Sequence, residues 1–463
     1  MKVAVVGAGW AGLSAAVRLR ADGHDVRLLD AAPRAGGRAR SLTVDWGHGE
    51  AVELDNGQHL MIGAYAELLA LLAFVDAPAG GAPSLVRSPM QLLSTGGLAL
   101  RSADLGGVLR AAGLGWRSRL ALLRVLAGLR LAGERRARAV AGLTVERWWR
   151  DTAQPAELVE RIWRPLVLSA LNTAPAEACA ATFLRVLRDS VAGEPGASDF
   201  LLPDASLGAV FVDPVLRWLL AHGAQWSPGH AIARITREPG DRGALRLHRS
   251  GYPAEAAIET DAVVIATPPA AAARLLDGLP PAAPVAAALR RFGHRPITTV
   301  YLGWRDAPTG SGTAAAPWRR FDALPVATML EDIASSGWHG QWFFRRSAPA
   351  GWRIGAVVIS DSRLASAMPA DTLADAIGAQ VHEQLALPAP HASKVLHEKR
   401  ATFACTPDRP RIGHDIAGLP GVVLAGDYQH RDYPATLEAA LRSGRSAAAR
   451  LAAGTAHQTA AIA

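Results

Sequence analysis

The stretch that decides the fold is KVAVVGAGWAG, residues 2–12. The apolar residues 2–6 predict a short buried strand, and residues 11–21 predict a helix. A second strand is expected over residues 25–29, ending at Asp30. Together these segments predict a β-α-β unit of about thirty residues at the start of the chain.

The glycines of this unit predict a dinucleotide-binding turn. Gly7 permits the tight turn, Gly9 lets the backbone approach a pyrophosphate, and Gly12 lets the helix pack on the strand. Between them, Trp10 and Ala11 open the helix, whose N-terminus offers N–H groups to the phosphates. Asp30 ends the second strand, so we expect its carboxylate to accept hydrogen bonds from the adenosine ribose and to disfavour a 2′-phosphate.

The glycine turn fits both NAD and FAD, and the next segment distinguishes between them. Gly36, Gly37 and Arg38 follow Asp30 closely. They can bring backbone N–H groups and a guanidinium onto the same pyrophosphate. A simple NAD domain does not need this addition, so the sequence favours FAD.

A third segment lies near the end of the chain. Residues 421–425 predict a buried strand, which ends at Gly426 and Asp427. Ala435 and Thr436 then begin a predicted helix. A carboxylate at the strand end can bind ribitol hydroxyls, and a helix N-terminus can stabilise negative charge on the N1/O2 edge of the flavin. The alternative is an ordinary surface turn between a strand and a helix.

Composition narrows the class of protein. The chain has 463 residues, which at about 100–200 residues per domain suggests two or three domains. Cys179 and Cys405 lie far apart, so no disulfide framework, thiol redox pair or zinc site is predicted, and no other metal site is expected. The net charge of +8 admits nucleic acid, an anionic membrane or an acidic substrate as partner, or simply an arginine-rich composition. Because the basic residues are mostly dispersed, we expect no nucleic acid.

Residues 105–140 differ from the rest. They predict one basic amphipathic helical stretch, with arginines among leucines and valines and Glu134 as the one acid. One interpretation is a helix lying on an anionic membrane surface, and the other is an ordinary solvated helix face. The glycines interrupt the N-terminal apolar run, so no signal peptide is predicted. We expect a cytoplasmic protein, with peripheral contact to the inner face of the cell membrane if the first interpretation holds.

These motifs resemble the amine oxidase and phytoene desaturase superfamily of FAD enzymes. The resemblance rests on GAGWAG, Asp30, GGR, VVIATP at 263–268 and PATLEAALRSG at 434–444. It implies an α/β, amine-oxidase-like fold with a discontinuous Rossmann-type FAD-binding domain and a second, α+β substrate domain. The implied FAD-binding domain comprises 1–75, 205–275 and 396–463, and the implied substrate domain comprises 76–204 and 276–395.

Other segments resemble a narrower family, the hydroxysqualene dehydroxylases or squalene-associated FAD-dependent desaturases. They are DNGQH at 55–59, GAY at 63–65, WRPL at 163–166, LNT at 171–173, AGD at 425–427 and PAT at 434–436. The resemblance implies reductive dehydroxylation of hydroxysqualene to squalene, a step of squalene and hopanoid biosynthesis. It also implies that Ile232 lies at the adenine and that Gln58 and His59 approach the isoalloxazine. The sequence departs from the family at 428–433, which is bulkier and more charged.

The implied reaction needs an acid, an apolar cavity and a hydride from reduced FAD. Candidate acids are His59 first, then Asp432 and Tyr433, although His59 can instead bond only the flavin or the backbone. The substrate would be a long apolar isoprenoid, in a tunnel that the Trp-rich residues 143–190 line unless they are ordinary core. The chain has no second dinucleotide fingerprint, so a separate electron donor is expected.

Three rival functions stay open. A phytoene or squalene desaturase would use the same fold with the hydride moving in the opposite direction. A flavin amine oxidase is the second rival, disfavoured by the scarcity of lysine in this chain. The third is a non-catalytic FAD-binding partner that organises a lipid-synthesis complex.

Overall fold

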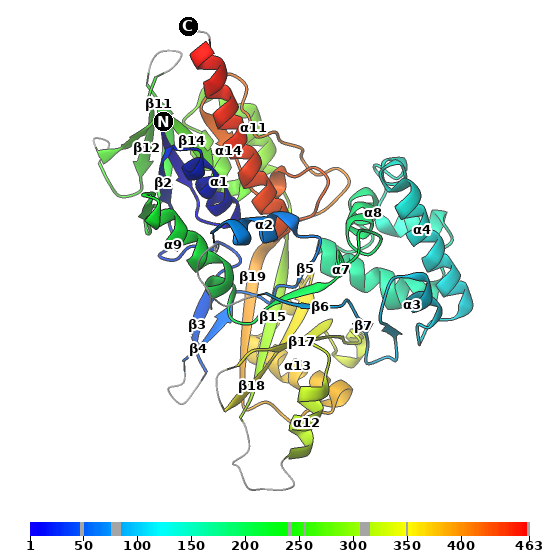
Figure 1. Cartoon of the computed structure of the whole chain (residues 1–463). Coiled ribbons are helices and arrows are strands. Elements are labelled where there is room, and N and C mark those ends of the chain that lie inside the picture. Colours follow the sequence, from blue (N-terminus) through cyan, green and yellow to red (C-terminus); the bar gives the residue numbers. More distant parts are fainter. Residues whose placement is uncertain are drawn as a thin grey trace.

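A computed structural model describes residues 1–46, 51–75, 85–238, 243–253, 256–305, 315–348 and 351–460. Two sheets and a group of helices organise these residues (Figure 1).

The first sheet is parallel and carries the predicted β-α-β unit. Its strand order is β10-β2-β1-β14-β20, with every neighbouring pair parallel. The predicted strands and helix of the unit are present, as is the strand predicted at 421–425. The strands are β1 (Lys2–Val6), β2 (Asp25–Leu29), β10 (Gln225–Ser227), β14 (Ala262–Ile265) and β20 (Val422–Leu424).

Helices from distant segments cover this sheet. The helices α1 (Trp10–Ala21) and α14 (Leu437–Ala460) lie side by side, as Figure 1 shows. Glycine permits their contact, because a Cβ on Gly444 would lie 2.1 Å from the Ala11 carbonyl oxygen. The C-terminal helix is thereby fixed beside the N-terminal turn. The other helices around this sheet are α2 (Ala66–Val75), α9 (Asp213–Ala221), α10 (Pro269–Leu276) and α11 (Ala283–Arg290).

The second sheet is antiparallel, with strand order β16-β17-β18-β15-β19. Its strands are β15 (His294–Arg305), β16 (Ala327–Met329), β17 (Trp342–Arg346), β18 (Trp352–Ser360) and β19 (Ala392–Phe403). Its core packs Trp304, Phe343 and Val357 against Ile377 of α13 (Ala370–Leu385). The helix α12 (Ala315–Ala323) lies nearby. The domain boundary expected between 395 and 396 falls inside β19.

A helical lobe, residues 105–189, projects from the side of the molecule in Figure 1. The single amphipathic stretch predicted over 105–140 is wrong in one respect, because the chain forms two helices there. The first of these helices ends at Leu109, and the break before Trp116 contains Gly113, which has a φ of 74°. The lobe consists of α3 (Leu105–Leu109), α4 (Trp116–Ala139), α5 (Val145–Asp151), α6 (Ala156–Leu158), a π-helical turn (Val159–Trp163), α7 (Arg164–Leu171) and α8 (Ala180–Asp189).

Smaller sheets complete the fold. The hairpin of β3 (Ser41–Asp45) and β4 (Ala51–Asp55) lies beside the antiparallel sheet in Figure 1. A second small sheet joins β5 (Met61–Ile62), β9 (Phe200–Pro203) and β6 (Leu85–Ser88). A third joins β11 (Ile232–Arg237), β12 (Leu245–Arg249) and β13 (Ile258–Thr260), and a fourth joins β7 (Leu92–Leu93) and β8 (Ala99–Leu100).

A buried ion pair ties β4 to the antiparallel sheet. Asp55, whose side chain is fully buried, accepts a 2.9 Å bond from Arg346 of β17. The other carboxylate oxygen accepts from Ser41 and from the Leu207 amide. The Tyr301 hydroxyl of β15 also donates to the Asp55 carbonyl oxygen at 3.0 Å. The aspartate of the DNGQH motif therefore has a structural role.

We expect Arg346→Met to destabilise the protein by about 3–5 kcal/mol, because it leaves Asp55 buried without its cation. The free energy of unfolding in urea measures the change. Arg450→Met is the matched control, since its pair with Asp415 is more than half exposed on both sides and contributes about 0–1 kcal/mol. An equal, small loss in both variants would contradict the structural role of the buried pair.

Candidate active site

A cavity of about 1840 Å³ opens at the carboxyl ends of the parallel strands and extends between the antiparallel sheet and the helical lobe. Open α/β sheets bind ligands at this edge. A pocket for one ligand typically has about 300–1,000 Å³. The volume therefore accommodates a dinucleotide together with a second ligand.

The glycine turn forms one end of the cavity. Gly7 has a φ of 108°, and a Cβ there would lie 2.5 Å from the Ala266 carbonyl oxygen. A Cβ on Gly12 would lie 1.8 Å from the Gly7 oxygen, so both glycines serve packing. Gly9 is different, because its Cβ would meet nothing in the described chain closer than Gly37 Cα at 3.8 Å. The space in front of Gly9, Trp10 and the start of α1 belongs to the cavity.

Asp30 lines the cavity and also organises the turn. Its carboxylate accepts bonds from the Ala8 amide at 2.6 Å and the Ala32 amide at 2.8 Å. The Gly36 amide donates to the Ala8 carbonyl oxygen at 2.9 Å, which places the GGR segment against the first turn. A carboxylate has about four acceptor positions, so Asp30 retains capacity for a ribose.

Arg38 and Asp427 meet although they are 389 positions apart. Arg38 Nη2 donates to Asp427 Oδ2 at 2.8 Å, and Nη1 donates to the Ala401 carbonyl oxygen at 2.8 Å. Asp427 is only 5% exposed. Gly426, with a φ of 156°, leaves no room for a Cβ, which would lie 2.4 Å from the Tyr428 ring. The GGR segment and the Gly426–Asp427 segment therefore share one wall of the cavity.

Thr436 caps the N-terminus of the last helix. The structure starts α14 at Leu437, slightly later than the sequence predicts, and the Thr436 hydroxyl accepts from the Ala439 amide at 3.1 Å. Ala435 and Thr436 both line the cavity. Ile232, the first residue of β11, lines it as well, at the side where the adenine is expected.

Gln58 and His59 line the cavity between the two sheets. The Gln58 Oε1 atom is buried and has no hydrogen-bond partner among the described residues. His59 Nδ1 lies 2.9 Å from the Gly57 carbonyl oxygen. Burial lowers the pKa of His59 below its usual range, although Asp55 and the Gly57 carbonyl oppose the shift. The imidazole is therefore neutral near pH 7, with Nδ1 donating to Gly57.

The other candidate acids lie beside the helical lobe. The Tyr433 hydroxyl donates a short hydrogen bond to Asp189 at the end of α8, and both residues line the cavity. Burial, followed by this hydrogen bond, raises the pKa of Tyr433 to about 12. Asp432 is absent from the described cavity lining, and its half-exposed carboxylate pairs with Arg185 at 3.0 Å.

Asp189 was not predicted from the sequence. It is the last residue of α8 and belongs to no recognisable motif, so only the fold brings it to Tyr433. Arg188 pairs with Asp189 at 2.5 Å and with Glu134 at 2.7 Å, while Arg442 lies over the Tyr433 ring at 5.3 Å. Charged groups from three elements thus surround one phenol at the cavity wall.

The remaining lining is largely apolar, but the tryptophans of 143–190 do not supply it. Among the described residues, Trp148, Trp149 and Trp163 pack in the core of the lobe and are absent from the lining. Trp148 and Trp163 both contact the ring of Phe183, which does line the cavity. The apolar side chains that do line this part include Met90, Leu92, Leu166, Phe183, Leu187, Ile297, Trp342, Phe344, Val358 and Leu396.

The residues present fit a flavin dinucleotide. The open space at Gly9 suits a pyrophosphate, the buried Gln58 Oε1 lacks a donor among the described residues, and Arg38 and Asp427 offer a guanidinium and a carboxylate at the same wall. The buried Thr267 hydroxyl also has no partner in the described chain and lines the cavity. These unpaired polar atoms would cost about 1–3 kcal/mol each without a ligand.

Comparison with known proteins also indicates a flavin enzyme. The family model for flavin containing amine oxidoreductases matches residues 10–452. A curated hydroxysqualene dehydroxylase from Rhodopseudomonas palustris is 28% identical over 96% of this chain and 97% of its own length.

Two solved structures share the fold. A putrescine oxidase variant has a TM-score of 0.73 at 16% identity, covering 98% of both chains. Cyclohexylamine oxidase from Brevibacterium oxydans has a TM-score of 0.69 at 18% identity, also covering 98% of both chains. The expected amine-oxidase-like α/β fold is confirmed. The chain thus belongs to the flavin containing amine oxidoreductase family and is an FAD-dependent oxidoreductase.

Proposed function

We propose that this enzyme removes the hydroxyl group of hydroxysqualene reductively and releases squalene. The observation that carries the proposal is a single cavity that joins the flavin-binding wall to a long apolar chamber. Similarity over nearly the whole chain to a hydroxysqualene dehydroxylase supports the same substrate. A long hydrocarbon alcohol would fill the chamber without burying charge.

The proposed roles of the cofactor residues follow from their places in the cavity. Gly7, Gly9, Trp10, Ala11 and Gly12 form the pyrophosphate turn, with Gly36, Gly37 and Arg38 on its other side. Asp30 faces the adenosine ribose, and Ile232 faces the adenine. Gln58, His59, Gly426, Asp427, Ala435 and Thr436 surround the ribitol and the isoalloxazine. The division into a discontinuous FAD-binding domain and a substrate domain remains part of this proposal.

In the reaction, the carbon loses its hydroxyl as water and gains a hydride. The residues named above would hold FAD, which would supply that hydride when bound in its reduced form. The apolar walls exclude water, which protects a cationic carbon from being trapped by water again. The chain must also provide the proton that the hydroxyl takes with it.

Tyr433 is the acid that we favour among the three candidates. It lines the cavity, and its hydroxyl is protonated at neutral pH and bonded to Asp189, a contact that it must leave in order to donate to the substrate. His59 also lines the cavity, but its lowered pKa leaves it neutral at pH 7, and its Nδ1 is directed at Gly57. Asp432 lies behind this wall, in an ion pair with Arg185.

Two partners belong to the proposal. A separate electron donor would reduce the flavin, since the sequence carries one dinucleotide fingerprint. An anionic lipid surface would contact α4. Its solvent side carries Trp116, Leu120 and Leu131, which are 70%, 39% and 87% exposed. Their spacing places them on one helix face with Arg124, while the opposite face is buried.

The helix therefore has the character of one that lies on a membrane rather than one that crosses it. No helix in the described ranges is long and apolar enough to span a bilayer. Arg119 Nη1 donates to the Leu109 carbonyl oxygen at 2.6 Å, which brings the exposed Leu105 and Leu109 of α3 beside the start of α4. Apolar side chains among arginines suit an anionic interface.

The Gly9→Ala substitution tests the pyrophosphate site. The backbone at Gly9 has φ −74° and ψ 179°, which alanine adopts readily, and the added Cβ has room in the protein. We expect FAD affinity to fall about tenfold or more, as the methyl displaces the pyrophosphate. The apoprotein should unfold at an unchanged urea concentration. Unchanged FAD affinity would place the pyrophosphate elsewhere.

Anaerobic single turnover tests the reaction. The enzyme is reduced, mixed with hydroxysqualene, and followed by flavin absorbance and product extraction. We expect one squalene per flavin, with reoxidation of the cofactor. Intact alcohol would contradict the proposal, and flavin reduction by an isoprenoid hydrocarbon added to the oxidised enzyme would identify a desaturase instead.

The same assay tests Tyr433. We expect Tyr433→Phe to slow squalene formation about 100-fold with FAD content unchanged. The wild-type rate should stay level between pH 6 and 9, because Tyr433 loses its proton only near its pKa of about 12. If His59 were the acid, the rate would instead fall as pH rises through its lowered pKa, and Tyr433→Phe would remain active.

Flotation with vesicles tests the lipid contact. We expect binding to phosphatidylglycerol vesicles, and a drop of about tenfold or more when Trp116, Leu120 and Leu131 are all changed to serine. Serine at Leu220 and Leu364 is the control, since these side chains are 52% and 79% exposed on other elements. Equal loss in both variants, or equal binding to neutral vesicles, would rule out this surface.

A further inference from the structure

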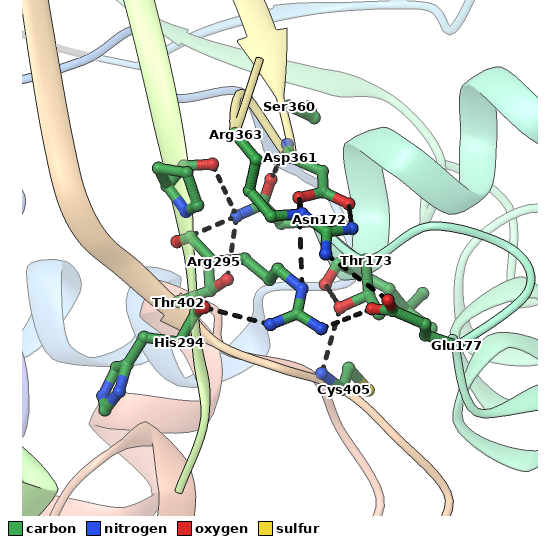
Figure 2. Close-up of polar contacts among 12 residues, drawn as sticks. Asn172, Thr173, Glu177, His294, Arg295, Ser360, Asp361, Arg363, Thr402 and Cys405 are labelled. Carbon is green, nitrogen blue, oxygen red and sulfur yellow. Dashed lines mark hydrogen bonds and ion pairs between the residues drawn. The ribbon is translucent and has the colours of Figure 1, made fainter. Parts of the chain in front are cut away.

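The end of α7 is held by one buried amide. α7 stops at Leu171, and Asn172 adopts a left-handed conformation with φ 48° and ψ 38°. Its side chain is nearly inaccessible. Figure 2 shows its amide between two neighbours: Oδ1 accepts from the Asp361 amide at 2.6 Å, and Nδ2 donates to the Thr402 hydroxyl at 2.9 Å. Nδ2 also lies 3.4 Å from the Arg295 carbonyl oxygen.

These partners belong to three neighbouring strands. Arg295 is in β15, Asp361 follows β18, and Thr402 is in β19. The pairing of β15 with β19 changes register between Arg295 and Ile297, beside the amide. One side chain of the helical lobe therefore contacts the ends of three strands of the antiparallel sheet.

Ion pairs beside Asn172 reinforce this joint between the helical lobe and the antiparallel sheet. Glu177, a few residues beyond Asn172, pairs with Arg295 and with Arg363, which in turn binds Asp361 at 2.7 Å (Figure 2). The hydrogen bond and charge of Arg295 hold the pKa of Glu177 below its usual range. Cys405 extends the joint, as its amide donates to the Thr173 hydroxyl at 3.0 Å.

Both sides of the joint form walls of the substrate chamber. Asn172 and Thr402 themselves line the cavity. The helical lobe adds Leu166, Ser169 and Ala170 from α7, and the sheet adds Ile297, Val358, Ser360 and Leu396. The joint therefore sets the distance between two walls that a long substrate would touch.

We infer that Asn172 is a positioning residue, which fixes the helical lobe against the antiparallel sheet and thereby orients a long apolar substrate in the chamber. The identity of that substrate rests on the proposed function. Nothing in the motif LNT requires this role by itself, but the left-handed conformation, the burial and the three strand contacts explain why an asparagine stands there. Asparagine tolerates this conformation better than most residues.

The test compares Asn172→Asp with Gln380→Glu. Each replaces a buried amide with an acid of the same shape and removes one donor. Gln380 on α13 makes a similar set of bonds, accepting from the Gly340 amide at 2.8 Å and donating to its carbonyl oxygen at 2.9 Å. It anchors the same sheet but is absent from the described cavity lining. A loss of stability alone would affect both variants alike.

For Asn172→Asp we expect kcat with hydroxysqualene to fall about tenfold to 100-fold, because small misplacements are costly in rate, while FAD content stays at the wild-type level. Gln380→Glu should keep kcat within about threefold of wild type. If Asn172→Asp does not fold, Thr402→Val replaces it, as it removes one partner of the amide. Equal kcat values in the Asn172 and Gln380 variants would overturn the inference.

A second readout does not depend on turnover. Squalene added to the oxidised enzyme is the probe, and the change in flavin absorbance reports where the chain lies. The inference predicts an altered difference spectrum for Asn172→Asp and an unaltered one for Gln380→Glu. If wild type leaves hydroxysqualene intact but this contrast appears, the proposed reaction fails and the positioning role stands. An identical spectrum in all three proteins would overturn the positioning role.

Discussion

The ion pair between Arg38 and Asp427 is the constraint on which the flavin site depends. It joins two segments that lie 389 positions apart, and the helix contact at Gly444 holds them together. Neither segment alone closes the cavity wall, since the first brings the Arg38 guanidinium and the last strand brings the Asp427 carboxylate. A partly buried pair of this kind contributes little net stability, because the cost of desolvating both charges offsets much of their attraction. Its main effect here is to define where the two segments meet.

The substrate chamber depends on two further joints. The Asp55–Arg346 pair fixes the hairpin of β3 and β4 to the antiparallel sheet, and Asn172 fixes the helical lobe to the same sheet. The cavity lies where the three regions meet. Its shape therefore follows from a few buried polar contacts rather than from any single element. The walls of the chamber can therefore differ between members of the family while the flavin segments remain.

Much of the fold was predictable because its signals are local. A few adjacent residues suffice to predict a dinucleotide site in three places: the strand–turn–helix at the start, the GGR segment and the terminal Gly-Asp. What the sequence could not show depends on contacts between distant residues. Asp189 meets Tyr433 only in the fold, and no motif marks it. The tryptophans of the lobe looked like cavity lining, yet Trp163 is core while Trp342 of the sheet lines the chamber, because periodicity does not reveal which neighbour a helix face meets. The break between α3 and α4 was missed because the arginine and leucine pattern continues across the glycines.

The most direct measurement is a double-mutant cycle on the dissociation constant of FAD, using Arg38→Met, Asp427→Asn and the combination. If the two residues act as one unit at the flavin wall, each single change should weaken FAD binding about tenfold. Independent effects would weaken binding about 100-fold in the double variant. We expect instead a loss no more than about threefold beyond that of a single variant, which corresponds to a coupling free energy of about 1 kcal/mol. Strictly additive effects would contradict the account, because they would mean that the two ends of the chain contribute to the site independently.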